Sequence, residues 1–213
     1  MEILKAIIFD FDGTLANTLP VNIYSFQQVF KKFDNKSLSN NEVVDLFGPP
    51  EPEIITEQLN NTQLEEAIEH YFKVYEDHHN RLVDKNHEIE KMLAVIKQKD
   101  IKLGVVTGKS RRSLNISLEK LDLKEQFDVI VTGDEVDDDK PNPEGVLKAL
   151  SELNVTNEEA MYIGDSDGDI HAGKRAGLAV AGVQWLPEYQ SSEYTTEPDA
   201  VFTRPDELFG FLK

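Results

Sequence analysis

The sequence predicts an α/β protein, a doubly wound parallel sheet interrupted by an all-helical insert. Short apolar runs alternate with helix-periodic segments from residue 85 onward, which is typical of a parallel sheet with crossover helices. One further apolar run lies near the start of the chain, and only helical patterns separate it from the others. The 213 residues, 39% hydrophobic and 29% charged, show ordinary globular usage and are enough to bury a core.

The first strand and the insert follow one another along the chain. A strand is expected at 5–9, an apolar run that ends at Asp10, as in strands buried on both faces. After it, apolar residues recur every three or four positions, and Gly48-Pro49-Pro50 breaks the pattern. Helices are expected at 17–33, 53–59 and 64–79. We therefore expect a helical cap domain at 17–84, inserted into a core domain made of 1–16 and 85–213.

The rest of the chain alternates between the two patterns. Helices are expected at 88–98, 111–121, 143–153 and 169–176. Strands are expected at 102–106, 127–131, 161–163, 179–183 and 200–202. In a doubly wound sheet, ligands bind at the carboxyl ends of the strands, so the residues just after each strand are the first candidates for a site.

Charge and composition restrict the partners of the chain. Lysine and arginine number 22 against 40 aspartates and glutamates, and this net charge of -18 disfavours nucleic acids and anionic membranes. The absence of cysteine excludes disulfides and thiolate catalysis and is compatible with a reducing compartment. The apolar run before Asp10 is too short for a signal peptide. We expect a soluble cytoplasmic monomer or small homo-oligomer.

Polar groups follow four of the predicted strands. Asp10 and Asp12 come after the first strand, and the period of two of an extended chain places both carboxylates on one side. The other groups are Thr107-Gly108-Lys109-Ser110, which leads into a helix, then Lys140, and the run from Asp165 to Asp169. Mg²⁺ accepts carboxylates together with phosphate oxygens, and a helix N-terminus suits a phosphate. The set provides the groups that phosphoryl transfer to an aspartate requires.

With these four groups in order, the sequence resembles the haloacid dehalogenase superfamily of phosphohydrolases over nearly the whole chain. The resemblance implies that Asp10 is the nucleophile and a metal ligand, and that Asp12 is the general acid and base. It also implies that Asp12 offers its backbone carbonyl to the metal. The remaining roles are phosphate stabilisation by Thr107 and Lys140, with Gly108 contacting substrate, a further metal ligand at Asp165, and support of that ligand by Asp169.

The position of the insert resembles that of the helical cap in one branch of the superfamily. This branch includes phosphoglycolate phosphatases, pyrophosphatases and β-phosphoglucomutases. Asp12 argues against the dehalogenases, which lack the second acidic residue of this motif. Segments 47–50 and 77–83 are similar to the cap of bacterial inorganic pyrophosphatases, so Gly48 is expected to contact substrate. The resemblance implies Mg²⁺ as cofactor and a small phosphorylated substrate, with pyrophosphate first and phosphoglycolate second.

Other interpretations of the same residues fit less well. A P-loop ending at Lys109-Ser110 would need its first glycine at Leu103. A calcium loop starting at Asp165 would need glycine at Ile170. His78 and His79 are expected to be exposed helix residues. Two alternatives for function stay open, a phosphomutase of the β-phosphoglucomutase type and a catalytically silent phosphate-binding module.

Overall fold

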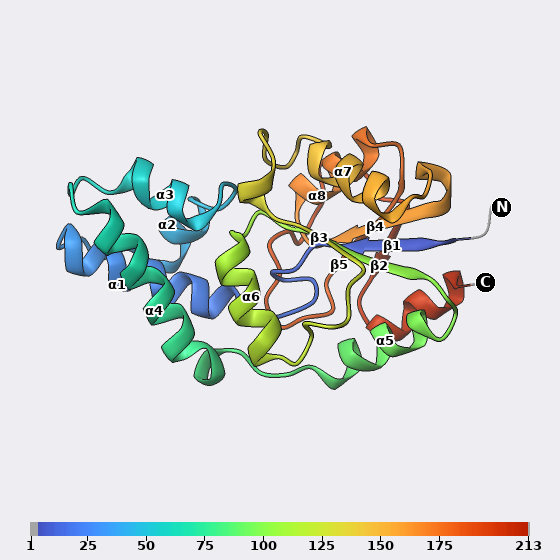
Figure 1. The fold of residues 1–213 in the computed structure, drawn as a ribbon, viewed down its shortest axis with the longest axis horizontal. Coiled ribbons are helices and arrows are strands. Elements are labelled where there is room, and N and C mark those ends of the chain that lie inside the picture. Colours follow the sequence, from blue (N-terminus) through green and yellow to red (C-terminus); the bar gives the residue numbers. More distant parts are fainter. Residues whose placement is uncertain (1–3, 213) are drawn as a thin grey trace.

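A six-stranded parallel sheet forms the centre of the molecule, which is a computed structural model that describes residues 4–212 (Figure 1). Residues 1–3 and 213, which the sequence assigns to the core domain, lie outside the described residues. The strands are β1 (Ala6–Phe9), β2 (Lys102–Val106), β3 (Val129–Val131), β4 (Ala160–Gly164), β5 (Ala179–Val183) and β6 (Ala200–Phe202). Their order is β3-β2-β1-β4-β5-β6, and all neighbours are parallel.

The central strand β1 pairs with β2 on one side and with β4 on the other. Ile7 is in register with Leu103 and with Met161. All four residues of β1 are fully buried, and they alternate between two apolar clusters, with Ile7 and Phe9 in one and Ala6 and Ile8 in the other. Both faces of the sheet are therefore covered, as the uninterrupted apolar run predicts.

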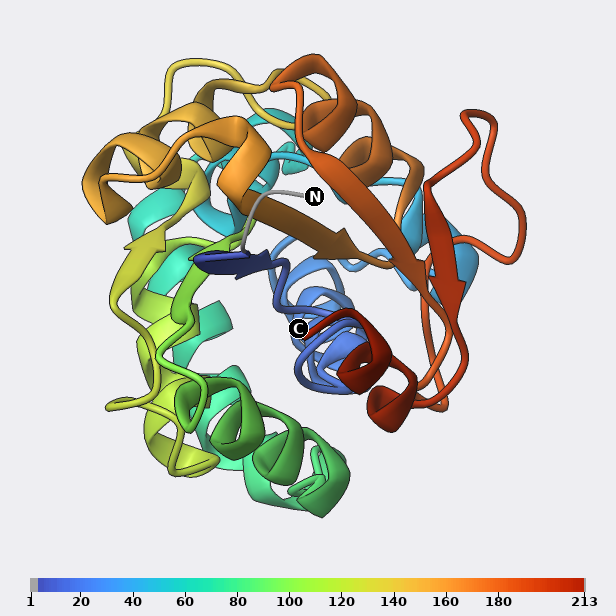
Figure 2. The ribbon, with the colours of Figure 1, turned by 90° about the vertical axis from the view of Figure 1, so that its right-hand side faces the viewer.

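Four α-helices of the core are distributed over the two faces of the sheet. They are α5 (His87–Lys97), α6 (Arg111–Lys120), α7 (Glu144–Leu153) and α8 (Asp167–Arg175). Helices α7 and α8 lie on one face, and α5 lies on the other beside the C-terminal 3₁₀ segment Pro205–Phe211 (Figure 2). This arrangement confirms the predicted doubly wound fold.

The insert between β1 and α5 is helical. It contains α1 (Leu19–Phe33), α2 (Asn40–Val44), α3 (Glu51–Gln58) and α4 (Leu64–Leu82), which lie together at one end of the sheet (Figure 1). Helices α1 and α4 pack closely, with the ring centroids of Phe26 and Tyr71 4.7 Å apart. The inserted helical domain is thus confirmed, while its boundaries at 16/17 and 84/85 remain a prediction.

Several element boundaries differ from those expected. Helix α3 begins at Glu51 rather than at residue 53, because proline is tolerated in a first helical turn, where its missing N–H needs no partner. The short helix α2 was not predicted, although Ser39 and Glu42 form a capping box there. Helix α8 begins at Asp167 rather than at residue 169, because Ser166 caps it.

Three further expectations differ from the structure. Helix α4 continues to Leu82, and β3 is shorter than the run 127–131. Neither histidine expected to be exposed is so: His79 is fully buried because it faces helix α6, and His78 is half-buried against the ring of Tyr24. Within residues 4–212, none of the helices has the length and apolar character to cross a membrane.

Candidate active site

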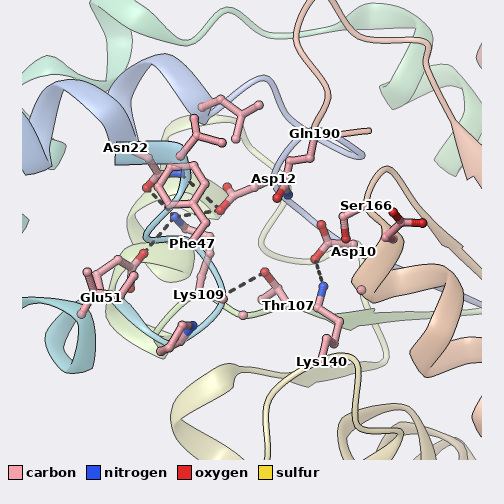
Figure 3. A pocket seen from close by; sticks show the side chains of 18 of the residues that line it. Asp10, Asp12, Asn22, Phe47, Glu51, Thr107, Lys109, Lys140, Ser166 and Gln190 are labelled. Atoms are coloured by element: carbon pink, nitrogen blue, oxygen red, sulfur yellow. Dashed lines mark hydrogen bonds and ion pairs between the residues drawn. The ribbon is translucent and has the colours of Figure 1, made fainter. Parts of the chain in front are cut away.

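Asp10 lies directly after β1, at the point where the strand order reverses and where ligands bind in doubly wound sheets. Its backbone N–H donates to the carbonyl of Ile163 on β4, so the end of β1 is held beside the end of β4. The side chain is 2% exposed, and its Oδ1 accepts a hydrogen bond from Lys140 Nζ at 2.8 Å (Figure 3). Burial raises the pKa of Asp10 from 3.8 to about 7, although the charge of Lys140 lowers it.

Asp165 comes after β4 and faces Asp10. One carboxylate oxygen each of Asp10, Asp165 and Asp169 lies within 4.8 Å of the others. Burial and then the charges of Asp10 and Asp169 raise the pKa of Asp165 well above its usual value. Buried carboxylates this close repel one another, and a hard divalent cation would relieve that repulsion. The residues therefore fit a magnesium ion.

Gly13 and Thr14, which follow Asp12, also shape the surroundings of Asp165. Thr14 Oγ1 donates to Asp165 Oδ1 at 3.2 Å, and the backbone N–H of Gln190 donates to its Oδ2 at 2.6 Å. Gly13 has φ +77°, and a Cβ there would overlap the Asp165 carboxylate. Only glycine fits this position, because both the backbone angle and the space exclude a side chain.

Both carboxylate oxygens of Asp169 accept two hydrogen bonds each. Its Oδ1 accepts from Lys140 Nζ at 2.6 Å and from the Tyr162 hydroxyl at 3.0 Å. Its Oδ2 accepts from the backbone N–H and the hydroxyl of Ser166, at 3.0 and 2.6 Å. A carboxylate with these donors is better suited to hold Lys140 than to bind a metal directly.

Asp12 has different surroundings from Asp10. It accepts hydrogen bonds from the Thr18 hydroxyl and from Asn22 Nδ2, the latter at 3.2 Å, and Lys109 Nζ lies 3.3 Å from its Oδ2. Asp10 and Asp12 both line the same cavity, whose volume is about 340 Å³. The intervening residue, Phe11, is buried in the apolar core.

Thr107 and Gly108 follow β2 and reach the same cavity. The Thr107 hydroxyl accepts a hydrogen bond from the backbone N–H of Lys109 at 3.3 Å. Gly108 lies against the cap, because a Cβ there would be 2.7 Å from the carbonyl oxygen of Gly48. The structure thus brings all the residues that the sequence singled out for the site to one place: Asp10, Asp12, Gly48, Thr107, Gly108, Lys140 and Asp165, with Asp169 behind them.

The sequence assigned no role to three further polar residues of the cavity. Lys109, Glu51 and Asn22 are each at most 5% exposed. Lys109 Nζ donates to Asn22 Oδ1 at 3.1 Å and to Glu51 Oε1 at 3.0 Å (Figure 3). Lys109 stood in a recognised segment, but Asn22 and Glu51 carry no local signal, because only the docking of the cap on the core brings them to the cavity.

A comparison with known protein families identifies the family of this chain. The sequence matches the family model of the haloacid dehalogenase-like hydrolases over residues 7–183. The chain belongs to this family. The predicted resemblance is confirmed.

Individual relatives resemble the chain along its whole length. Pyrophosphatase PpaX of Bacillus cereus is 32% identical over 209 residues, which cover 98% of this chain and 96% of the relative. The structure of a predicted phosphoglycolate phosphatase from Haemophilus somnus covers 100% of both chains with a TM-score of 0.87 and 21% identity, which shows the shared fold. CbbY from Rhodobacter sphaeroides, solved in complex with phosphate, has a TM-score of 0.85 and 25% identity, covering 97% of this haloacid dehalogenase-like chain and 96% of CbbY.

Proposed function

We propose that the cavity binds a small phosphate compound and that Asp10 takes its phosphoryl group. The enzyme is a phosphatase, a hydrolase of phosphoric monoesters or diphosphates. The observation that carries the proposal is the placement of Asp10. This buried carboxylate is paired with Lys140 at the reversal point of the strand order, and a second carboxylate, Asp12, lines the same cavity.

The reaction proceeds in two steps. A carboxylate oxygen of Asp10 forms a bond to phosphorus while the bond from phosphorus to the leaving oxygen breaks, and Asp12 donates a proton to that oxygen. Asp12, now a carboxylate, takes a proton from a water molecule. The water oxygen bonds to the phosphorus of the aspartyl phosphate while the bond from phosphorus to the Asp10 oxygen breaks, which releases phosphate and restores the Asp10 carboxylate. Lys140 and Thr107 stabilise the charge of the phosphoryl group.

Mg²⁺ is the proposed cofactor. Asp10 and Asp165 would hold it, together with the backbone carbonyl of Asp12. When bound, the ion neutralises negative charge on the phosphoryl group, which a carboxylate nucleophile would otherwise repel. Asp169 keeps Lys140 in place beside Asp10 through the hydrogen bonds described above.

A compact substrate suits a cavity of about 340 Å³. We propose inorganic pyrophosphate as the first choice and phosphoglycolate as the second, supported by the similarity to PpaX over nearly the full length of both proteins. Gly48 and Gly108 contact the substrate from the cap side and the core side, respectively. We also propose a cytoplasmic location, which is compatible with the absence of cysteine from the sequence.

The test is phosphate release from pyrophosphate, phosphoglycolate and β-glucose 1-phosphate with Mg²⁺, measured for the wild type and for Asp10→Asn. The variant should lose activity by a factor of at least about 10³, because an amide is neither a nucleophile nor an anionic ligand. Its circular dichroism spectrum should stay that of the wild type. Near-normal turnover by Asp10→Asn would contradict the mechanism.

Product analysis separates the alternatives for function. Conversion of β-glucose 1-phosphate to its 6-phosphate isomer, without phosphate release, would identify a mutase in which a substrate hydroxyl replaces water. Absence of turnover with every phosphate compound, together with phosphate binding, would favour the silent module.

A further inference from the structure

Glu51 is a carboxylate of the cap that is buried against the core. It is the first residue of α3 and is 5% exposed. Its Oε2 accepts from the backbone N–H of Ser110 at 2.9 Å, and its Oε1 accepts from the Ser113 hydroxyl at 2.6 Å and from Lys109 Nζ at 3.0 Å. These three donors belong to the end of the β2 loop and to the start of α6, so Glu51 joins the cap to the core.

The carboxylate of Glu51 is ionised in this position. Burial by itself raises the pKa of Glu51, but Lys109, Ser113 and Ser110 together bring it below its usual value. A buried charge of this kind is tolerated only where hydrogen bonds and an opposite charge compensate for lost hydration.

Lys109 is shared between two carboxylates. Its ammonium group contacts Glu51, Asp12 and the Asn22 amide oxygen, at 3.0, 3.3 and 3.1 Å (Figure 3). Two of these contacts are hydrogen bonds, to Glu51 and to Asn22, and the third is an ion pair with Asp12.

This group lies on the side of the cavity where the leaving group must be. Asp12 is the residue proposed to protonate the leaving oxygen, and Lys109 and Glu51 line the cavity beside it. Among the described residues that line this cavity, the cations are Lys109 and Lys140. Lys140 is held by Asp10 and Asp169, so Lys109 is the cation within reach of a charge on the leaving group.

Glu51 and an anionic leaving group therefore compete for the same ammonium group. Glu51 keeps two hydrogen bonds, from Ser110 and Ser113, when Lys109 turns away from it. The nearby negative charge of Glu51 nevertheless opposes a second anion at Lys109, because charges this close interact strongly in a buried site.

We propose that Glu51 is a specificity-determining residue that acts through Lys109 and reduces the preference of the enzyme for anionic leaving groups. Lys109 binds the charge on the leaving group, and Glu51 holds Lys109 in place and weakens that binding. This inference rests on the proposed phosphatase function, because the proposed mechanism is what places the leaving group beside Asp12.

The experiment compares substrates that differ in the charge of the leaving group. Phosphoglycolate has a carboxylate where hydroxyacetone phosphate has a neutral methyl ketone of similar size, and pyrophosphate leaves as phosphate. We would measure kcat/KM for all three with Mg²⁺ and take the ratio of each anionic substrate to hydroxyacetone phosphate. A ratio within one preparation does not depend on how much of a variant is folded.

Glu51→Gln should raise both ratios by about tenfold, and pyrophosphate should gain at least as much as phosphoglycolate because its leaving group carries more charge. Lys109→Met should change the same ratios in the opposite direction, even though all three reactions slow through the loss of its contact with Asp12. Glu53→Gln is the matched control, since it removes one carboxylate from an exposed position on the same helix, and its ratios should equal those of the wild type.

Equal changes for all three substrates in Glu51→Gln would overturn the proposal and show that Glu51 only docks the cap. Unchanged ratios in Lys109→Met would also overturn the proposal. If Glu51→Gln fails to fold, the ratios of Lys109→Met alone provide the test. If the wild type hydrolyses none of the three compounds, the proposed function fails and this inference fails with it. Hydrolysis by the wild type with unchanged ratios in the variants rejects the inference alone.

Discussion

Two carboxylates that stand two residues apart have different environments in this enzyme. Asp10 is almost fully buried and is paired with Lys140, whereas Asp12 is held by donors from the first cap helix and by Lys109. A nucleophile must be fixed in direction, and an acid and base must reach both the leaving oxygen and water. The two environments match the two proposed roles.

Replacement of Asp12 by Asn should separate these roles. The variant should still bind phosphate, but it should slow the hydrolysis of alkyl phosphates much more than that of p-nitrophenyl phosphate, by about 10²-fold against a few-fold. The reason is that only a poor leaving group needs a proton from Asp12. Steady-state kinetics on both substrates, with Asp10→Asn as the reference for complete loss, provides the measurement. Equal slowing on the two substrates would mean that Asp12 has a structural role.

At the scale of single residues, the sequence indicated those that belong to short motifs after strands. Asp10, Thr107 and Asp165 could be found because parallel strands bring their carboxyl ends together at one edge. Glu51 and Asn22 could not be found in this way, because they reach the cavity from helices that carry no site motif. Their positions follow only from how the cap packs on the core.

The cap and the core approach each other closely at two glycines, Gly48 and Gly108. The carbonyl of Gly48, before α3, lies where a side chain at Gly108, after β2, would have to be. This close approach brings Glu51 within hydrogen-bonding distance of Ser110 at the start of α6. The two glycines therefore fix the spacing between the cap and the end of β2.

Gly108→Ala should displace the cap segment, because its Cβ would lie 2.7 Å from the backbone oxygen of Gly48. We expect kcat/KM to fall by about tenfold or more for every substrate and the free energy of unfolding to fall by about 1–3 kcal/mol, as for other overpacked positions. Gly210→Ala is the control, since no atom lies within 4 Å of its added Cβ. Wild-type kinetics in Gly108→Ala would show that this contact does not position the cap.

Helix α4 of the cap also contacts α6 of the core, through His79. Its Nε2 lies 3.0 Å from the Ser117 hydroxyl, and burial lowers the pKa of His79 to about 4, with the charge of Lys109 acting in the same direction. The unfolded chain binds a proton at this histidine below pH 6.5, but the folded protein binds it only near pH 4. The free energy of unfolding should therefore decrease as the pH falls from 6.5 to 4.

His79→Gln should remove part of that pH dependence. Between pH 7.5 and pH 5 the wild type should lose on the order of 1 kcal/mol more stability than the variant, measured by urea unfolding. The same pH dependence in His79→Gln and in the wild type would contradict the assignment.

Helices and strands with a clear hydrophobic periodicity were predicted more accurately than those without one. Strands β2, β5 and β6 have the expected bounds, and the long cap helices α1 and α4 differ from expectation only at their ends. Helix α2 has five residues, too few to show a helical repeat, and it depends on its capping box and on packing against α1. The start of α3 was misplaced because prolines at a helix start resemble a break in the sequence.

The order of the strands places two buried aspartates next to each other, because β1 and β4 are neighbours in the sheet. The chain has a net charge of -18, and β1 and β4 each end in a buried aspartate at the reversal point. Lys140 compensates for part of this charge by its ion pairs with Asp10 and Asp169. Without a cation, the remaining repulsion between Asp10 and Asp165 should reduce the stability of the folded state.

Mg²⁺ should therefore raise the thermal midpoint of the protein as well as its activity. A ligand that binds only the folded state adds about 2.7 kcal/mol at a concentration of 100 times its Kd, which corresponds to a shift of several degrees in a chain of this size. Any salt will also screen a net charge of -18, so the informative quantity is the shift beyond that caused by NaCl at equal ionic strength. In Asp165→Asn, the additional shift of the thermal midpoint caused by Mg²⁺ should be absent, while the shift caused by NaCl should equal that of the wild type. An equal additional shift in both proteins, or full activity in the presence of excess chelator, would show that these carboxylates do not hold the ion.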